Sequence, residues 1–151
     1  MANNAIRVWN GSSWGTLEGR LNGPVYCLAV YRDLLIAGGE FDSAGGVGAR
    51  NIAAWDGSHW IPLGAGVDST VWGLTVFQNK LIVGGRFITA GEVSVRKIAA
   101  WNGYLWSDFG GGVDGIVVEG FAVYNNGLVV GGKFGTAGEV AANSIASWEP
   151  K

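Results

Sequence analysis

The chain repeats one pattern of tryptophan, glycine and phenylalanine about every 46 positions. Trp9, Trp55, Trp101 and Trp148 follow one another at intervals of 46, 46 and 47 residues. A second tryptophan, an isoleucine, a Gly-Gly pair and a phenylalanine keep the same spacing: Trp14, Trp60 and Trp106; Ile6, Ile52, Ile98 and Ile145; Gly38-Gly39, Gly84-Gly85 and Gly131-Gly132; Phe41, Phe87 and Phe134. A period of this length indicates a repeat architecture, in which neighbouring units bury each other's apolar faces. The extra residue of the last interval is predicted to lie in a loop near Gly115–Val117.

Each full unit is predicted to form four short strands. They are Val25–Tyr31, Leu34–Gly38, Asn51–Trp55 and Trp60–Leu63, with later copies at Val71–Phe77, Lys80–Gly84, Lys97–Trp101 and Trp106–Phe109, and then at Val118–Tyr124, Gly127–Gly131 and Ser144–Trp148. The first two strands of a unit are almost continuously apolar, which indicates burial on both faces of a sheet. The last two are joined by Asn-Gly or Asp-Gly, dipeptides that accept positive φ at both central positions of a tight hairpin. No segment shows a 3.6-residue apolar period, so we expect little helix.

Four strands in about 46 residues are typical of one blade of a β-propeller. We therefore predict an all-β fold of β-propeller blades, each with four antiparallel strands. A β-solenoid is the main alternative, although its coils are usually shorter. The chain holds about three blade equivalents. Residues 1–24 form strands three and four of a partial blade, 25–70 and 71–117 form blades, and 118–151 form strands one to three of a partial blade.

Two motifs carry a resemblance to known repeat families. The apolar strand that ends in Gly-Gly, Leu35–Gly39, is followed by a tryptophan-bearing strand and resembles the Kelch-type repeat. The string Gly-Gly-x-Phe-x-x-Ala-Gly…Ile-Ala-x-Trp-x-Gly-x-x-Trp, from Gly38 to Trp60, is similar to the propeller repeats of Rax2-like and bacterial cell-surface proteins. Trp55-Asp56 resembles the WD40 signature, but no Gly-His pair precedes it and the other copies carry Asn or Glu, so WD40 is disfavoured. The Kelch-type resemblance implies a protein-binding propeller, and its motifs mark the framework rather than a site.

Three blades are too few to close a ring, because known propellers have about four to eight. An open arc would leave apolar sheet faces in water, so we expect the chain to complete the ring by binding itself. A homodimer with six blades is favoured, and a homotrimer with nine is the second choice.

The strand count adds one complication to this picture. The strands sum to thirteen where twelve are needed, because Ile6–Trp9 and Ile145–Trp148 both fit strand three of the shared blade. Arg7 stands where the other copies have alanine, so the C-terminal segment fits a buried position better. We expect one of the two segments to be displaced or disordered. The duplication suggests a fragment of a longer repeat array, natural or engineered.

Composition disfavours several function classes. The net charge of −2 and the lack of a basic block argue against nucleic-acid binding. The longest apolar runs, such as Leu34–Ala37, are far too short to span a bilayer. The N-terminus lacks the features of a secretory signal, so the chain as it stands fits the cytoplasm. A piece of an exported parent protein fits equally well, so the sequence leaves the localisation open.

No set of residues has the pattern of a catalytic, metal or cofactor site. His59 is the only histidine and lies in a hairpin where other copies have Ser or Leu, so we interpret it as an ordinary exposed side chain. Cys27 aligns with glycine in the later copies, which favours a small, inert thiol. Asp68 and Asp114 are expected to cap a turn, and the glycine runs lack the Gly-Lys-Ser/Thr of a phosphate loop. We therefore expect no enzyme activity and no cofactor.

The aromatic residues that do not recur are the candidate binding residues. Tyr26 and Trp72 share one position of strand one with Glu119, and Tyr104 stands where other copies have serine. If strand one is innermost, its side chains line the central channel; the alternative is that they fill gaps between blades. We expect a non-enzymatic scaffold or binding module that takes a protein or peptide on one face of the ring. The alternative is a lectin-like glycan binder that uses Tyr26, Trp72 and Tyr104 to stack on sugars.

Overall fold

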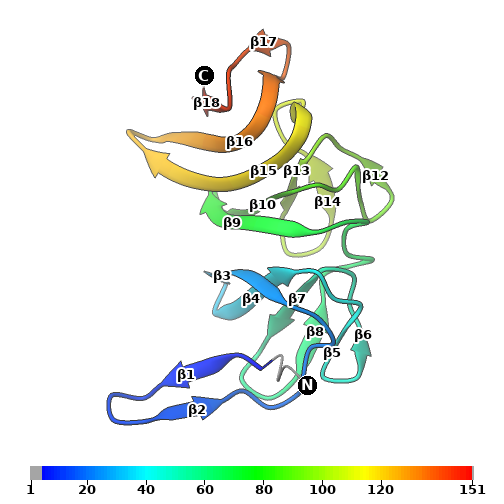
Figure 1. Cartoon of the computed structure of the whole chain (residues 1–151), viewed down its shortest axis with the longest axis vertical. Helices are drawn as coiled ribbons and strands as arrows, with labels where there is room; N and C mark the ends of the chain where they lie inside the picture. The colour runs from blue at the N-terminus through cyan, green and yellow to red at the C-terminus, as the bar shows by residue number, and fades with distance from the viewer. Residues whose placement is uncertain (1–4, 151) are drawn as a thin grey trace.

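The structure, a computed structural model, describes residues 5–150. These residues form strands β1 to β18, joined by turns and loops, and they contain no helix. The all-β prediction is therefore confirmed for this part of the chain. Figure 1 shows the strands gathered into successive sheets, with the hairpin β1–β2 at one end of the molecule and β15–β18 at the other.

Two four-stranded antiparallel sheets, which we name sheets I and II, form the middle of the chain. Sheet I consists of β3 (Val25–Tyr31), β4 (Leu34–Gly39), β7 (Ile52–Trp55) and β8 (Trp60–Pro62), and sheet II of β9 (Val71–Phe77), β10 (Lys80–Gly85), β13 (Ile98–Trp101) and β14 (Trp106–Asp108). All eight strands lie within one residue of their predicted bounds. Two short hairpins lie in the loops between the second and third strands: β5 (Ser43–Ala44) with β6 (Val47–Gly48), and β11 (Thr89–Ala90) with β12 (Val93–Ser94).

The third sheet, sheet III, lacks a fourth main strand among the described residues. It contains β15 (Val113–Tyr124), β16 (Gly127–Ala137), β17 (Val140–Ala141) and β18 (Ile145–Trp148), with β15 on one edge of β16 and the other two on the opposite edge. At the other end of the chain, β1 (Arg7–Trp9) and β2 (Trp14–Thr16) form a separate hairpin. Both segments that fit strand three, Ile6–Trp9 and Ile145–Trp148, thus contribute a strand in the single chain, where β1 pairs with β2 and β18 pairs with β16.

The extra residue of the 47-residue interval lies in a strand of sheet III and not in the predicted loop. Gly115–Val117 lies inside the long strand β15, and the pairing with β16 shifts register between Asp114 and Gly115, and again between Gly115 and Val117. A β-bulge absorbs one additional residue without ending the strand. The insertion therefore bends β15 and forms no loop.

The turn between strands three and four differs from the predicted two-residue hairpin. Trp55 pairs with Trp60, so four residues form the connection, and only Gly57 among them has positive φ, at 104°. The turns with positive φ at two successive residues join strands one and two instead, as at Gln78 (50°) and Asn79 (60°). The Asp-Gly and Asn-Gly dipeptides are held by side-chain hydrogen bonds, described below.

The sheets pack face to face along the chain. Ile36 and Ile52 of sheet I share one core cluster with Leu81 of sheet II, while Ile98 of sheet II packs with Leu128 of sheet III. Strand β9 lies beside both β3 and β15, so the first strands of the three sheets are neighbours (Figure 1).

The first residue of the Gly-Gly pair in sheets I and II permits this close stacking. A Cβ atom at Gly84 would lie 2.5 Å from Val118 Cγ1 of the next sheet, and Gly38 stands in the same relation to Val71. A larger residue at either position would push neighbouring sheets apart.

Candidate functional site

Equivalent positions of the repeat differ sharply in exposure between the middle and the ends of the chain. Ile52 and Ile98 are 0% and 3% exposed because the following sheet covers them, whereas Ile145 of sheet III is 65% exposed. The aromatic residue that ends strand one behaves in the same way: Phe77 is 6% exposed, and its copy Tyr124 is 69% exposed. Sheet III therefore presents an uncovered apolar face, which we name the sheet III end face, made by Tyr124, Val129 and Ile145.

Sheet I carries the complementary uncovered surface at the other end. Leu28 is 49% exposed, although its copies Leu74 and Phe121 pack against core clusters. Leu28 lies opposite Ala37 on β4, on the face that turns away from sheet II. We name this surface, formed by Leu28 and Val30, the sheet I end face. Two-sided burial, predicted for every first strand, is incomplete in β3 because no complete sheet covers this face.

The outer edge of β18 borders a groove of about 490 Å³. Phe109, Gly110, Gly138, Ile145 and Trp148 are among its lining residues. In sheets I and II, a fourth strand pairs with the corresponding edge of β7 and β13. An exposed strand edge offers unpaired N–H and C=O groups to another strand.

Two of the predicted binding residues come together in the structure. The rings of Tyr26 on β3 and Trp72 on β9 are stacked, with centroids 4.2 Å apart and planes inclined by 7°. Each ring covers one face of the other across the neighbouring strands β3 and β9, and the Tyr26 side chain stays 41% exposed. The Trp72 Nε1–H is buried and has no hydrogen-bond partner among the described residues.

The other two predicted residues lie apart from each other. Glu119 is exposed on β15, and its carbonyl faces Gly73, the residue after Trp72, so it belongs to the same row of first strands. Tyr104 lies in the turn before β14, is 79% exposed, and has the Arg32 guanidinium 6.0 Å from its ring centroid. Tyr104 is therefore not part of a common aromatic face with Tyr26 and Trp72.

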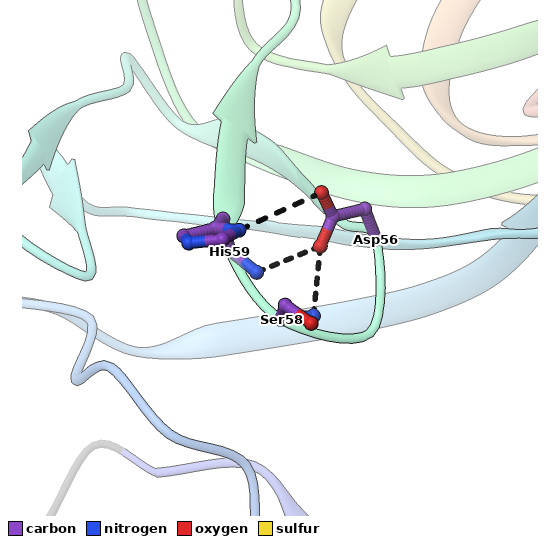
Figure 2. Close-up of polar contacts among 3 residues, drawn as sticks. All are labelled: Asp56, Ser58 and His59. Atoms are coloured by element: carbon purple, nitrogen blue, oxygen red, sulfur yellow. Dashed lines mark hydrogen bonds and ion pairs between the residues drawn. The ribbon is translucent and has the colours of Figure 1, made fainter.

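Figure 2 shows the turn that holds the only histidine. The Asp56 carboxylate accepts hydrogen bonds from the backbone N–H groups of Ser58 and His59, both at 2.7 Å, and these bonds lower the pKa of Asp56. The His59 ring is 3.9 Å from the second carboxylate oxygen. Asn102 makes the same two backbone bonds in the next copy of the turn, where no histidine is present. The recurrence identifies the arrangement as turn capping.

Cys27, Asp68 and Asp114 lie apart from one another, each in its own local surroundings. Burial raises the pKa of the Cys27 thiol to about 12, and its Sγ lies 3.7 Å from the Gly38 carbonyl oxygen. Asp68 was predicted to cap the turn after strand four, but it accepts hydrogen bonds from the backbone N–H groups of Ile88 and Thr89 in the loop before β11 instead. Asp114, predicted to do the same, lies in β15. Within residues 5–150, no three His, Cys, Asp or Glu side chains are grouped closely enough to hold a metal ion. Nor do these residues form a helix with the length and apolar character needed to cross a membrane.

Sequence reasoning missed the residues that the structure exposes at the ends. Ile145 recurs in all four copies and Trp14 in three, which predicts framework positions, yet each is 65% exposed. The available signal was their place in the two units of the repeat that are incomplete within residues 5–150. Neither the models of protein families nor the curated protein sequences contain a match to the chain.

Proposed function

We propose that the chain is a non-catalytic scaffold built of β-propeller blades that associates with itself into a closed ring. The sheet III end face of one copy packs on the sheet I end face of another, as sheet I packs on sheet II within the chain. Kelch-type and Rax2-like repeats are the families whose motifs fit this arrangement best. The ring offers a face for a protein or peptide partner.

The observation that supports the proposal most strongly is the difference in exposure between residues at the same position of the repeat. Ile98 is buried by the next sheet, and Ile145, the same residue at the same position, stands 65% exposed with no sheet beyond it among the described residues. Full burial of an isoleucine side chain contributes about 1.5–3 kcal/mol. The sheet III end face adds Tyr124 and Val129 to Ile145, and the sheet I end face presents Leu28 and Val30, so association covers apolar surface that a soluble monomer rarely leaves in water.

Two copies give the simplest closed ring. Each copy supplies three sheets, and six lies within the range of about four to eight blades that propellers adopt. Three copies would supply nine, outside that range. In a dimer the two seams are identical, as the two-fold symmetry of most homodimers requires.

Molar mass in solution tests the proposal. Light scattering coupled to size-exclusion chromatography is expected to give about twice the 15.8 kDa of one chain at micromolar concentration. The variant Ile145→Asp places a charge on the sheet III end face and is expected to give the mass of one chain. The control Ile88→Asp changes an isoleucine that is also exposed, at 56%, but whose repeat position already holds Asp42 in the first copy.

Two results would contradict the proposal. One is a mass of one chain for the unmodified protein throughout the concentration range. The other is an Ile145→Asp variant that assembles as well as the unmodified protein does. Circular dichroism of each variant establishes that a lower mass reflects lost association and not lost folding.

A further inference from the structure

The fourth-strand tryptophan of sheet II occupies a slot built by the preceding repeat. Trp106 is 8% exposed, and its Nε1–H donates to the Leu63 carbonyl at 2.9 Å. Glycines make room for the indole: a Cβ atom at Gly91 would lie 3.0 Å from Cδ1 of Trp106, and one at Gly64 would lie 3.4 Å from Nε1. Trp60 of sheet I is 5% exposed, with Gly45 against its Cδ1, and its Nε1–H donates to the Glu18 and Gly19 carbonyls, both at 3.1 Å.

Sheet III contains the same slot without a tryptophan from its own repeat. The repeat equivalents of Leu63, Gly64 and Gly91 are Phe109, Gly110 and Gly138, and all three line the groove beside β18. Gly138 has a φ of 58°, close to the 57° of Gly91, so the backbone of the slot is already in its occupied conformation. The groove is therefore shaped for an indole that a fourth strand would deliver.

Trp14 is the tryptophan of that repeat position, and it lies at the opposite end of the chain. It is 65% exposed and belongs to β2, which pairs only with β1. The register of that pairing sets Trp9 opposite Trp14, just as Trp55 stands opposite Trp60 and Trp101 opposite Trp106. Strand β2 is thus arranged as a fourth strand that already has a third strand beside it.

Strand β1 is the more weakly held of the two candidate third strands. All three of its residues are exposed, and an isolated two-stranded hairpin is marginally stable. Strand β18 pairs with four residues of β16, and Ala146 and Trp148 pack against the core cluster between sheets II and III. Arg7 occupies the repeat position of Ala146, which is 0% exposed in its copies Ala53 and Ala99. Placing a guanidinium there would bury an unpaired charge.

We propose that β2 exchanges β1 for β18 of a second copy and inserts Trp14 into the groove beside that strand. Ala146, Ser147 and Trp148 of the second copy then stand opposite Thr16, Gly15 and Trp14, the partners that Arg7, Val8 and Trp9 hold in one chain.

The Trp14 Nε1–H then donates to the Phe109 carbonyl of the second copy. Ile145 of that copy replaces Ile6, which is 9% exposed and packs beside Leu21 and Ala37. In the single chain, strand β1 pairs with β2 and thereby competes with β18 of the second copy for the same edge of β2. This inference rests on the proposed ring, because the groove is filled only at a seam between copies.

Two tryptophan variants distinguish association through this strand exchange from association through other contacts between the copies. Trp14→Ala removes the inserted side chain and is expected to weaken association at least about 30-fold at each seam, as the loss of a buried aromatic anchor does. Trp9→Ala weakens only the β1–β2 pairing, so it is expected to leave association as strong or to strengthen it. Both side chains are more than half exposed in one chain, at 65% and 52%, so neither change removes much of the core. The measurement is the dissociation constant from sedimentation equilibrium.

The outcomes are distinct. Association of Trp14→Ala at the strength of the unmodified chain overturns the insertion while leaving the ring in place. Equal weakening by Trp9→Ala and Trp14→Ala shows that β1 itself crosses the seam and overturns the exchange. If the unmodified chain and Trp9→Ala are both monomeric, self-association fails and this inference fails with it.

An engineered disulfide tests directly which residues of β2 and of β18 in the second copy lie opposite each other. Chains carrying Gly15→Cys and Ser147→Cys, each in a Cys27→Ala background, are mixed and oxidised, and the expected product is a covalent pair of the two chains. Directly opposed residues on paired strands lie within the Cα separation that a disulfide spans. If this covalent product does not form, although the same two cysteine variants still associate under reducing conditions, the exchange is also overturned.

Discussion

The repeated tryptophan allows one substitution to be compared at a covered and an uncovered position. Trp106→Ala removes an indole that is 8% exposed and donates a buried hydrogen bond to the Leu63 carbonyl. Truncating a buried tryptophan costs about 3–5 kcal/mol. Trp14→Ala removes an indole that is 65% exposed, and substitutions at such surface positions usually change the unfolding free energy by about 0.5 kcal/mol or less. With a urea dependence of about 2 kcal/mol per M, Trp106→Ala is expected to lower the midpoint by about 2 M.

The assay is urea unfolding followed by circular dichroism at two protein concentrations tenfold apart. For an associating chain, a tenfold rise in concentration adds about 1.4 kcal/mol to the apparent stability of a dimer. The unmodified chain is expected to show this dependence, and Trp14→Ala is expected to lose it. Similar midpoints for Trp106→Ala and Trp14→Ala, measured at a concentration at which both variants are single chains, would refute the reasoning, because they would mean that the two indoles have equal surroundings.

Two further predictions concern single side chains. Because hydrogen bonds from Ser58 and His59 lower the folded-state pKa of Asp56, its contribution to stability is present above its ordinary pKa of 3.8 and disappears as the pH falls through the lower folded value. Asp56→Asn, which copies the turn at Asn102, is expected to unfold less steeply with acid while matching the unmodified midpoint at pH 7; acid titration monitored by circular dichroism checks this, and an unchanged acid profile would contradict it. Burial raises the pKa of Cys27 to about 12, so the thiol is expected to react with iodoacetamide at pH 8 far more slowly in the folded chain than in urea, as mass spectrometry of the alkylated protein measures, and equal rates in the two states would show an accessible thiol.

Much of the fold followed from local sequence features. The 46-residue spacing predicted the strands of sheets I and II to within one residue, because side-chain polarity and turn residues are set by each strand's own sequence. The errors arose where several conformations suit the same residues. Asp56-Gly57 fits a two-residue hairpin, but a side-chain oxygen that accepts two backbone N–H groups stabilises a four-residue turn. The residue added near Gly115–Val117 was absorbed by a bulge, which its own sequence does not reveal.

The candidate site was less predictable than the fold. Tyr26 and Trp72 were singled out as one repeat position, and only the adjacency of β3 and β9 brought their rings into a stack. Tyr104 has the same aromatic character but lies in an outer turn, away from that pair. A shared repeat position thus predicts contact only when the strands that carry it are neighbours.

The sequence by itself determined the repeat, the strand type of each segment and the residues that form the framework. The tertiary structure decided which copies of that framework are covered. Ile98 and Ile145 have the same side chain at the same repeat position, and Trp106 and Trp14 likewise, yet one member of each pair is buried and the other is exposed. Local sequence sets the direction of a side chain on its strand, whereas burial depends on whether another sheet lies against that face.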